Sequence, residues 1–219
     1  MIKLYDYYRS TAAYRVRIAL NLKGVVYSQA PVNLRKGEQS HPDYRSLNPQ
    51  CLVPTLETED GRLLRQSLAI CEYLEEVYPQ PPLLPAEAIG RARVRALAQA
   101  IACDIHPLNN LRVLRYLSTA LDAGNPQQSA WYHHWIHKGF EALESMLATD
   151  PQAGRYCYGD QTTLADLYLV PQVFNANRFE VDLANYRNIR RINDACLELA
   201  AFDRARPERQ PGASSGEAG

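Results

Sequence analysis

Three short segments combine residue types that can hold an anionic or peptide-like ligand. In the first, Ser10 and Thr11 follow a β-rich run over residues 2–7 and precede apolar residues at helical spacing. The first turn of a helix carries backbone N–H groups without intrahelical partners and the positive end of the helix dipole. A thiol or acid held there is stabilised as its anion. The alternative is that Ser10 only caps its helix, a common role for serine.

A second segment, Val53-Pro54, stands directly before the extended run of residues 55–58. Proline lacks a backbone donor and restricts strand pairing at the edge of a sheet. The N–H and C=O of the residue before it are then open to an extended peptide, which binds as an added strand. The alternative is a turn proline that only leads into an edge strand, and the Val53-Pro54 bond can be cis or trans.

A third segment, Gln66-Ser67, opens an apolar run with helical spacing over residues 68–78. Free backbone N–H groups at such a helix start suit a carboxylate, although plain helix capping explains the same residues. Taken one at a time, the three segments are better explained as caps and turns. Their combination is what indicates a binding site.

The elements around these segments indicate a small α/β domain over residues 1–80. A crossover helix makes its strands parallel and a tight hairpin makes them antiparallel, so the order βαβ followed by ββα predicts a mixed sheet. Asp60-Gly61 predicts a type I′ hairpin, in which both residues take positive φ. The expected strands are residues 2–7, 25–32, 53–58 and 63–65, and the expected helices lie between Ser10 and Gly24 and over residues 68–78.

Four prolines within residues 79–85 predict a stiff linker, because the segment can neither be helical nor supply the donors of a sheet. Helical spacing dominates residues 86–205, which predicts an all-helical second domain. Thr163 and Asp166 form a capping-box pattern in it, and a last helix is expected from about residue 185 to 199. Residues 206–219 have the composition of a disordered tail.

Composition excludes several classes of function. The 219 residues carry 24 basic and 24 acidic side chains, whereas a nucleic-acid-binding protein needs a basic face. No apolar run approaches the roughly 20 residues of a membrane span, and no signal peptide precedes the first expected strand. The five cysteines are scattered, without a CxxC pair or a histidine at ligand spacing. This pattern predicts reduced thiols in the cytoplasm and no metal site.

The same segments resemble the zeta class of glutathione transferases. Residues 9–20 (RSTAAYRVRIAL) and the LKG at residues 22–24 are similar to that family's RSSCSWRVRIAL-LKG signature, and the resemblance runs from about residue 2 to 211. Other matching segments are residues 48–56, 66–70, 72–76, 103–110, 165–172 and 177–183. The resemblance implies the glutathione transferase fold, with a thioredoxin-like N-terminal domain and an all-α C-terminal domain, and a homodimer.

The resemblance also implies an activity, the glutathione-dependent cis–trans isomerisation of maleylacetoacetate or maleylpyruvate in aromatic catabolism. Reversible addition of a thiolate to the cis double bond allows rotation, and elimination restores the bond in trans form. A thiol has an ordinary pKa of about 8.5, which Ser10, assisted by Thr11, is expected to lower. The family's Ser-Ser-Cys reads Ser-Thr-Ala here, with Ala12 in third place, so a mechanism that needs a protein thiol at that position is excluded.

Glutathione-binding residues follow from the resemblance, residue by residue. The tripeptide is expected along the Val53-Pro54 edge, with its γ-glutamyl carboxylate at the start of the next helix and its glycyl carboxylate near the second domain. The residues assigned to glutathione are Ser10, Gln50, Val53, Pro54, Gln66 and Ser67, with His106 and Asn110 as candidates for the glycyl end.

Arginines are expected to bind the second substrate, because a dienoate of this class carries carboxylates and arginine binds them bidentately. Arg9 and Arg178 match the family's carboxylate-binding arginines; the alternative is that they are surface or ion-paired residues. Arg15 and Arg17 are expected to be structural, on a helix flank or at a subunit contact.

Other functions remain open at this stage. A general glutathione transferase or dehalogenase needs no paired arginines, and a non-catalytic docking protein has no use for a thiol-activating serine. Two tryptophans and three histidines within residues 131–137 suggest an aromatic or metal site. We expect these residues instead to pack a helix and to expose solvated histidines, because no acidic or cysteine ligand accompanies them.

Overall fold

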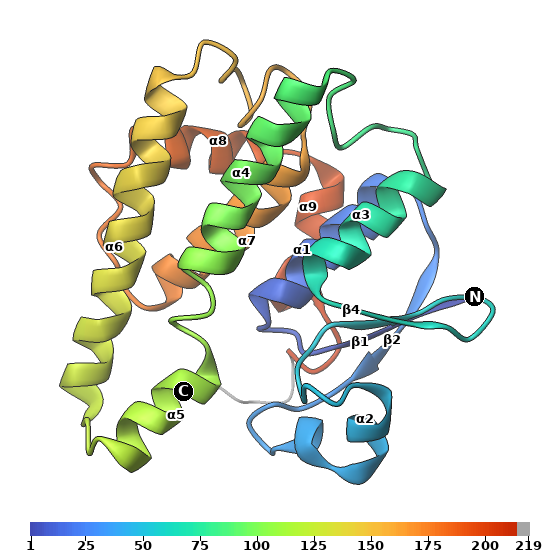
Figure 1. Cartoon of the computed structure of the whole chain (residues 1–219), viewed down its shortest axis with the longest axis vertical. Coiled ribbons are helices and arrows are strands. Elements are labelled where there is room, and N and C mark those ends of the chain that lie inside the picture. The colour runs from blue at the N-terminus through green and yellow to red at the C-terminus, as the bar shows by residue number, and fades with distance from the viewer. Residues whose placement is uncertain (214–219) are drawn as a thin grey trace. The chain divides into compact units, whose positions relative to one another are not determined.

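The computed structural model describes residues 1–213, which fall into two compact units (Figure 1). One unit comprises Met1–Pro82 together with the described residues from Glu198 onward, and the other comprises Leu83–Leu197. The first boundary lies inside the proline-rich segment 79–85. Within residues 1–213, no helix has the length and apolar character needed to cross a membrane.

A four-stranded mixed sheet forms the core of the first unit. Its strands are β1 (Ile2–Asp6), β2 (Tyr27–Pro31), β3 (Thr55–Glu57) and β4 (Leu63–Arg65), in the order β2-β1-β3-β4. β1 pairs parallel with β2 and antiparallel with β3, which pairs antiparallel with β4. The predicted mixed sheet is therefore confirmed. Ile2 and Leu4 are buried, as the two-residue period of a strand requires.

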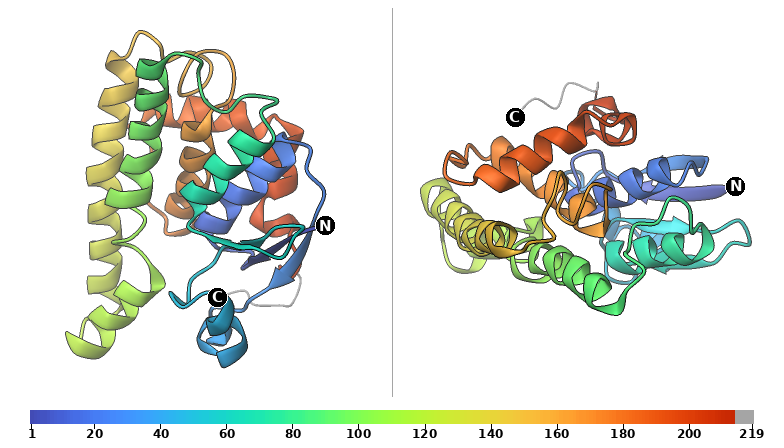
Figure 2. Two further views of the ribbon diagram at one scale, coloured as in Figure 1. Left: turned by 45° about the vertical axis from the view of Figure 1, so that its right-hand side comes forward. Right: turned by 90° about the horizontal axis from the view of Figure 1, so that it is seen from above.

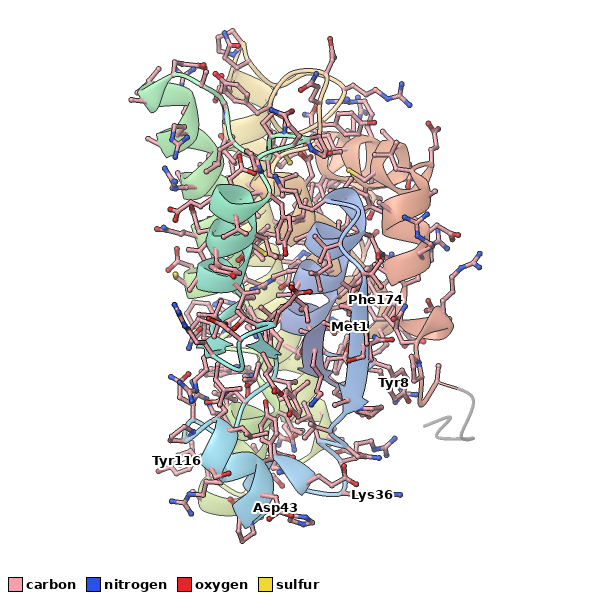
Figure 3. All side chains as sticks on the ribbon, turned by 90° about the vertical axis from the view of Figure 1, so that its right-hand side faces the viewer. Met1, Tyr8, Lys36, Asp43, Tyr116 and Phe174 are labelled. Carbon is pink, nitrogen blue, oxygen red and sulfur yellow. The ribbon has the colours of Figure 1, made fainter. Side chains whose placement is uncertain are left out.

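Helices cover both faces of this sheet. α1 (Thr11–Leu22) and α3 (Ser67–Val77) lie on one side, and the short α2 (Pro42–Leu47) lies on the other (Figures 1 and 2). A 3-10 turn, η1 (Glu38–Ser40), precedes α2. In Figure 3, Tyr8 marks the connection from β1 to α1, and Asp43 marks α2. The α1 connection thus places Ser10 directly after the central strand.

The β3–β4 hairpin forms as predicted, but its turn type was predicted wrongly. Gly61 has φ +80°, whereas Asp60 does not share the positive φ that a type I′ turn requires at both positions. The connection is five residues long, residues 58–62. Two hydrogen bonds between its first and last residues, Thr58 and Arg62, close it. The Thr58 amide donates to the carbonyl of Arg62 at 2.9 Å, and the Arg62 amide donates to the Thr58 hydroxyl oxygen at 3.0 Å.

The described residues from Glu198 onward belong to the first unit. The sequence had predicted that residues up to 205 belong to the helical domain. The expected last helix forms as α8 (Arg187–Leu197), and a short helix that the sequence did not predict, α9 (Ala200–Ala205), follows it and packs against α1. The fully buried guanidinium of Arg17 donates to the Ala205 carbonyl at 3.1 Å and pairs with Asp6 at 2.9 Å. Arg17 is structural, as expected.

Residues 206–213 are folded, which corrects the prediction of a disordered tail over this stretch. A 3-10 turn, η2 (Pro207–Arg209), leads to the buried Gln210, whose side-chain oxygen accepts a hydrogen bond from Gln29 at 3.0 Å. The side-chain amide of Gln210 donates to the carbonyls of Arg204 and Arg206, both at 2.7 Å. The rest of the predicted tail, residues 214–219, lies outside the described residues.

The second unit is helical, as the sequence predicted. α7 packs against α4 and α8, while α6 packs against α4, α5 and α8. The bounds of the helices not yet given are α4 (Ala88–Asp104), α5 (Leu111–Ala120), α6 (Asn125–Thr149) and α7 (Leu164–Arg178). α7 is the most deeply buried of these helices, and its N-terminus is fixed by the predicted capping box.

Asp166 is the centre of that capping box. Its carboxylate accepts hydrogen bonds from the Thr163 amide and the Cys157 amide, both at 2.8 Å, and the side chain is completely buried. Burial raises the pKa of this carboxyl, and the two amides oppose that shift. The carboxylate thus joins the start of α7 to the preceding loop.

Replacing Asp166 with alanine is expected to destabilise the protein by about 3 kcal/mol, because two buried amides lose their acceptor. Chemical denaturation measures the change. Asp182 provides the control, since it accepts an equivalent bond from the Ala184 amide at 2.9 Å on the surface. Asp182→Ala should cost less than about 1 kcal/mol. Equal effects of the two substitutions would contradict this account.

Candidate functional site

Ser10 lies at the start of α1 and serves as its N-cap. The Ala13 amide donates to its hydroxyl oxygen at 3.2 Å, and the Ser10 amide donates to the Tyr7 carbonyl at 2.8 Å. A hydroxyl has one donor and two acceptor sites. Accepting from Ala13 therefore leaves the hydroxyl proton available for a ligand, so the capping and ligand-binding interpretations are compatible. Thr11, the next residue, is buried, whereas Ser10 is half-buried.

Arg9 lies beside Ser10 and is half-buried. Its guanidinium carbon is 5.2 Å from the centre of the Tyr8 ring, a cation–π distance. The Tyr8 carbonyl in turn accepts a hydrogen bond from the buried Arg17 at 3.0 Å. The buried Arg17 of α1 thus holds the connection that carries Arg9 and Ser10.

The Val53-Pro54 edge is supported by a buried polar cluster that the sequence did not reveal. The carbonyl of Leu52 accepts from the Tyr44 hydroxyl at 2.6 Å and from the Asn48 side-chain amide at 2.8 Å. Both side chains also contact the Thr55 hydroxyl, at 2.9 and 3.1 Å. The residues on either side of Val53-Pro54 are therefore held in place.

Val53 itself presents its backbone for pairing. The Val53-Pro54 bond is cis, and among residues 1–213 no partner is found for the Val53 N–H or C=O. The Val53 side chain packs into a cluster with Tyr7, Tyr8, Val32 and Tyr44. The side chain is thus anchored while the backbone groups can bind an extended peptide.

Gln66 and Gln50 meet at the start of α3. The Gln66 side-chain amide donates to the Gln50 side-chain oxygen at 3.0 Å, and Gln66 does not cap the helix with its side chain. Gln66 has φ +71°, a conformation that is uncommon for a residue other than glycine and is found preferentially at ligand sites. The capping alternative is therefore wrong for Gln66.

Ser67 is buried behind this pair, and a cation stands next to it. The guanidinium of Arg15, itself 1% exposed, donates to the Ser67 hydroxyl oxygen at 3.2 Å. Arg15 was expected to be structural, and no sequence pattern signals this contact because 52 residues separate Arg15 from Ser67. A buried guanidinium and a helix N-terminus together make this position favourable for a carboxylate.

Three candidate residues belong to the second unit. Asn110 is the N-cap of α5, and its side-chain oxygen accepts from the Arg112 amide at 3.1 Å. His106, in the same connection between α4 and α5, is half-buried. Arg178 is exposed in the last turn of α7, with its guanidinium carbon 4.6 Å from the centre of the Phe179 ring.

The aromatic and histidine residues of α6 pack the helix, as expected, but two of the histidines are not simply solvated. His133 contacts the Phe179 carbonyl through Nε2 at 2.7 Å, and His137 contacts the Tyr186 hydroxyl through Nδ1 at 2.7 Å. His134 is exposed. Within the described residues, no group of three or more His, Cys, Asp or Glu is arranged to hold a metal ion.

Comparisons with known proteins agree with this geometry. Residues 9–77 match the family model described as "Glutathione S-transferase, N-terminal domain". A maleylpyruvate isomerase from a Ralstonia species is 54% identical over 210 residues, which are 96% of this chain and 99% of that protein. A maleylacetoacetate isomerase from Rattus norvegicus is 47% identical over 95% of this chain and 93% of that protein.

Solved structures give the same result. The holo structure of a bacterial zeta-class maleylpyruvate isomerase has a TM-score of 0.94 and 53% identity, and the match covers 97% of this chain and all of the other. The chain belongs to the zeta class of glutathione S-transferases. A maleylacetoacetate isomerase from Methylobacterium extorquens, solved with malonate and glutathione, also has a TM-score of 0.94, with 43% identity over 96% and 99% of the two chains.

This transferase has no thiol at the third position of its Ser-Thr-Ala sequence, and its buried cysteines do not replace one. Burial raises the pKa of Cys71 to about 12, and it also raises the pKa values of Cys157 and Cys196. These thiols stay protonated at neutral pH and are poor nucleophiles. The three buried cysteines therefore do not supply a nucleophilic thiolate at neutral pH.

Proposed function

We propose that this transferase is a glutathione-dependent cis–trans isomerase of a maleyl dienoate, either maleylacetoacetate or maleylpyruvate. The observation that carries the proposal is the place of the Ser10 hydroxyl at the start of α1, where its oxygen accepts from the Ala13 amide and a hydroxyl that accepts can also donate. Close relatives over nearly the whole chain are named as isomerases of these two compounds.

The first unit offers hydrogen-bonding groups and a cation that suit glutathione. The Val53 backbone groups pair with the cysteinyl residue of the tripeptide, and Ser67, Gln66 and the α3 N-terminus bind its γ-glutamyl carboxylate, with Arg15 as a buried cation behind them. Gln50 adds an amide next to Gln66. From the second unit, His106 and Asn110 are proposed for the glycyl carboxylate.

The division of chemical roles follows from residue type. Bound glutathione supplies a thiolate that adds reversibly to the cis double bond, so that rotation can occur before elimination. The Ser10 hydroxyl donates a hydrogen bond to the sulfur, and the α1 N–H groups stabilise its negative charge. Thr11 assists from the same helix start. Arg9 and Arg178 bind the carboxylates of the dienoate and stabilise the charge that spreads onto it during the reaction.

We also propose a homodimer and a cytoplasmic location, each supported by one observation. The family resemblance supports the dimer, and sedimentation should give a mass near twice 24.7 kDa at micromolar concentration. The five cysteines are free, which is typical of a reducing compartment. A monomeric mass would overturn the proposed dimer.

Ser67→Ala is expected to weaken glutathione binding by about 1 to 3 kcal/mol, the range for a lost hydrogen bond to a charged group. Calorimetry measures this change. The control is Ser46→Ala, since the Ser46 hydroxyl donates to the Asp43 carbonyl on the exposed surface of α2. Unchanged affinity in Ser67→Ala would remove Ser67 from the site.

The proposed activity is tested by following both maleyl compounds by absorbance in the presence of glutathione. The expected result is isomerisation of at least one of them with a kcat/KM at least 100 times that for conjugation of a neutral chloroaromatic electrophile, the order of selectivity that two charged hydrogen bonds supply. Faster conjugation than isomerisation would instead assign the protein to the general transferases.

A further inference from the structure

Two adjacent residues of α6, Tyr132 and His133, hold the C-terminal end of α7. His133 Nε2 lies 2.7 Å from the carbonyl oxygen of Phe179. A carbonyl only accepts hydrogen bonds, so this nitrogen carries a hydrogen and donates. The Tyr132 ring stacks on the Phe179 ring with a centroid distance of 3.7 Å and an interplanar angle of 18°. The backbone and the ring of Phe179 are thus each fixed by one residue of α6.

Phe179 in turn contacts Arg178. The guanidinium carbon of Arg178 lies over the Phe179 ring, 4.6 Å from its centre. Because the Tyr132 ring already covers one face at van der Waals distance, the guanidinium occupies the opposite face. The Phe179 ring therefore lies between the buried Tyr132 and the exposed Arg178. Because Tyr132 belongs to α6, the placement of α6 determines where the Arg178 guanidinium rests.

Tyr132, which supports the Phe179 ring from α6, is itself firmly held. Tyr132 is 1% exposed, its hydroxyl receives a hydrogen bond from the Asn175 side-chain amide, and its carbonyl accepts from Asn109 at 3.3 Å. The helix end is closed by the Val181 amide, which donates to the Ala176 carbonyl at 3.0 Å. Arg178 itself is exposed and has a long side chain, and ordering such a side chain on a ligand costs entropy.

We propose that His133 is a positioning residue for the dicarboxylate substrate. By holding the Phe179 carbonyl it fixes the ring against which the Arg178 guanidinium rests, so that the planar donor fork is already oriented for a carboxylate. The inference rests on the role of Arg178 under the proposed function. His133 acts through Phe179 and Arg178 and does not itself touch the substrate.

Calorimetry with two ligands tests the inference without measuring turnover. Glutathione and S-(1,2-dicarboxyethyl)glutathione share the tripeptide, so the ratio of their affinities isolates the contribution of the added carboxylates. His133→Phe keeps the ring shape but removes the donor. It should lower this ratio by about fivefold to tenfold, the effect of one lost hydrogen bond, and leave the affinity for glutathione unchanged.

Further variants distinguish positioning from general stability. His133→Gln restores a donor at similar reach and should recover most of the lost ratio, and Phe179→Leu, which removes the ring, should lower the ratio as His133→Phe does. The matched control is His134→Phe on the neighbouring exposed histidine, with no expected change. In an Arg178→Met background, His133→Phe should have no further effect, because the arginine that it positions is gone.

The outcomes separate this inference from the proposed function. If Arg178→Met lowers the affinity ratio but His133→Phe and Phe179→Leu do not, positioning by His133 is wrong while the role of Arg178 stands. If Arg178→Met leaves the ratio unchanged, the proposed role of Arg178 fails, and this inference fails with it. An equal loss of affinity for both ligands in His133→Phe would show a general structural role and would also overturn the inference.

Discussion

Removing both hydroxyls at the start of α1, in a Ser10→Ala/Thr11→Val variant, is expected to leave bound glutathione mostly protonated at neutral pH. A hydrogen bond to a charged group contributes about 1.5 to 3 kcal/mol, which corresponds to about one to two pKa units. The thiolate fraction at pH 7 should then fall by about tenfold to a hundredfold. The ultraviolet absorbance of the thiolate, titrated against pH with glutathione bound, measures the shift.

The two single variants divide the effect between the hydroxyls. Ser10 is half-buried and Thr11 is buried, so Ser10→Ala should produce most of the shift and Thr11→Val a smaller one. Ser10→Ala also removes a helix cap, which costs about 1 kcal/mol of stability, so unfolding is measured alongside. Full thiolate absorbance in the double variant would leave the α1 dipole as the only source of activation.

Replacing Arg178 with methionine should raise the KM for the maleyl substrate by about tenfold to a hundredfold, the range for a lost charged hydrogen bond. The pKa of the bound thiol and the turnover of a neutral electrophile should change little, because Arg178 is proposed to contact only the dienoate carboxylates. Steady-state kinetics with both substrates measures the difference.

Arg187→Met is the matched control for Arg178→Met. Arg187 is an exposed arginine at the start of α8 in the same unit, so its loss changes the net charge equally. An increase in KM that is the same in both variants would indicate a general electrostatic effect. An equal loss of activity with charged and neutral substrates in Arg178→Met would also contradict the assignment.

The sequence predicted those parts of the molecule that depend on neighbouring residues. Ser10 and the four-residue spacing after it predicted α1, the pattern at Thr163 and Asp166 predicted the start of α7, and the order of elements predicted the mixed sheet. The turn at Asp60-Gly61 was predicted wrongly, because hydrogen bonds of Thr58 lengthen the connection and local dipeptide preference does not include them.

The contacts that sequence reasoning missed join residues far apart in the chain. Arg15 reaches Ser67 from 52 positions away, Arg17 reaches Ala205 from 188 positions away, and His133 reaches Phe179 from 46. No helical or strand period records such pairs. For the same reason, residues 206–213 were expected to be disordered, although Gln210 accepts a hydrogen bond from the distant Gln29. The candidate site residues were chosen by family resemblance. The buried groups that hold them in place, such as Arg15 and Arg17, are found only in the structure.

A thiol balance tests most directly whether the protein isomerises a maleyl dienoate with glutathione as a true cofactor. The enzyme is incubated with excess maleylpyruvate or maleylacetoacetate and a small, known amount of glutathione, and trans product and free thiol are counted together. We predict many turnovers per glutathione molecule, no loss of free thiol, and no product when glutathione is omitted. Product formation without glutathione, or consumption of one thiol for each substrate converted, would contradict the account.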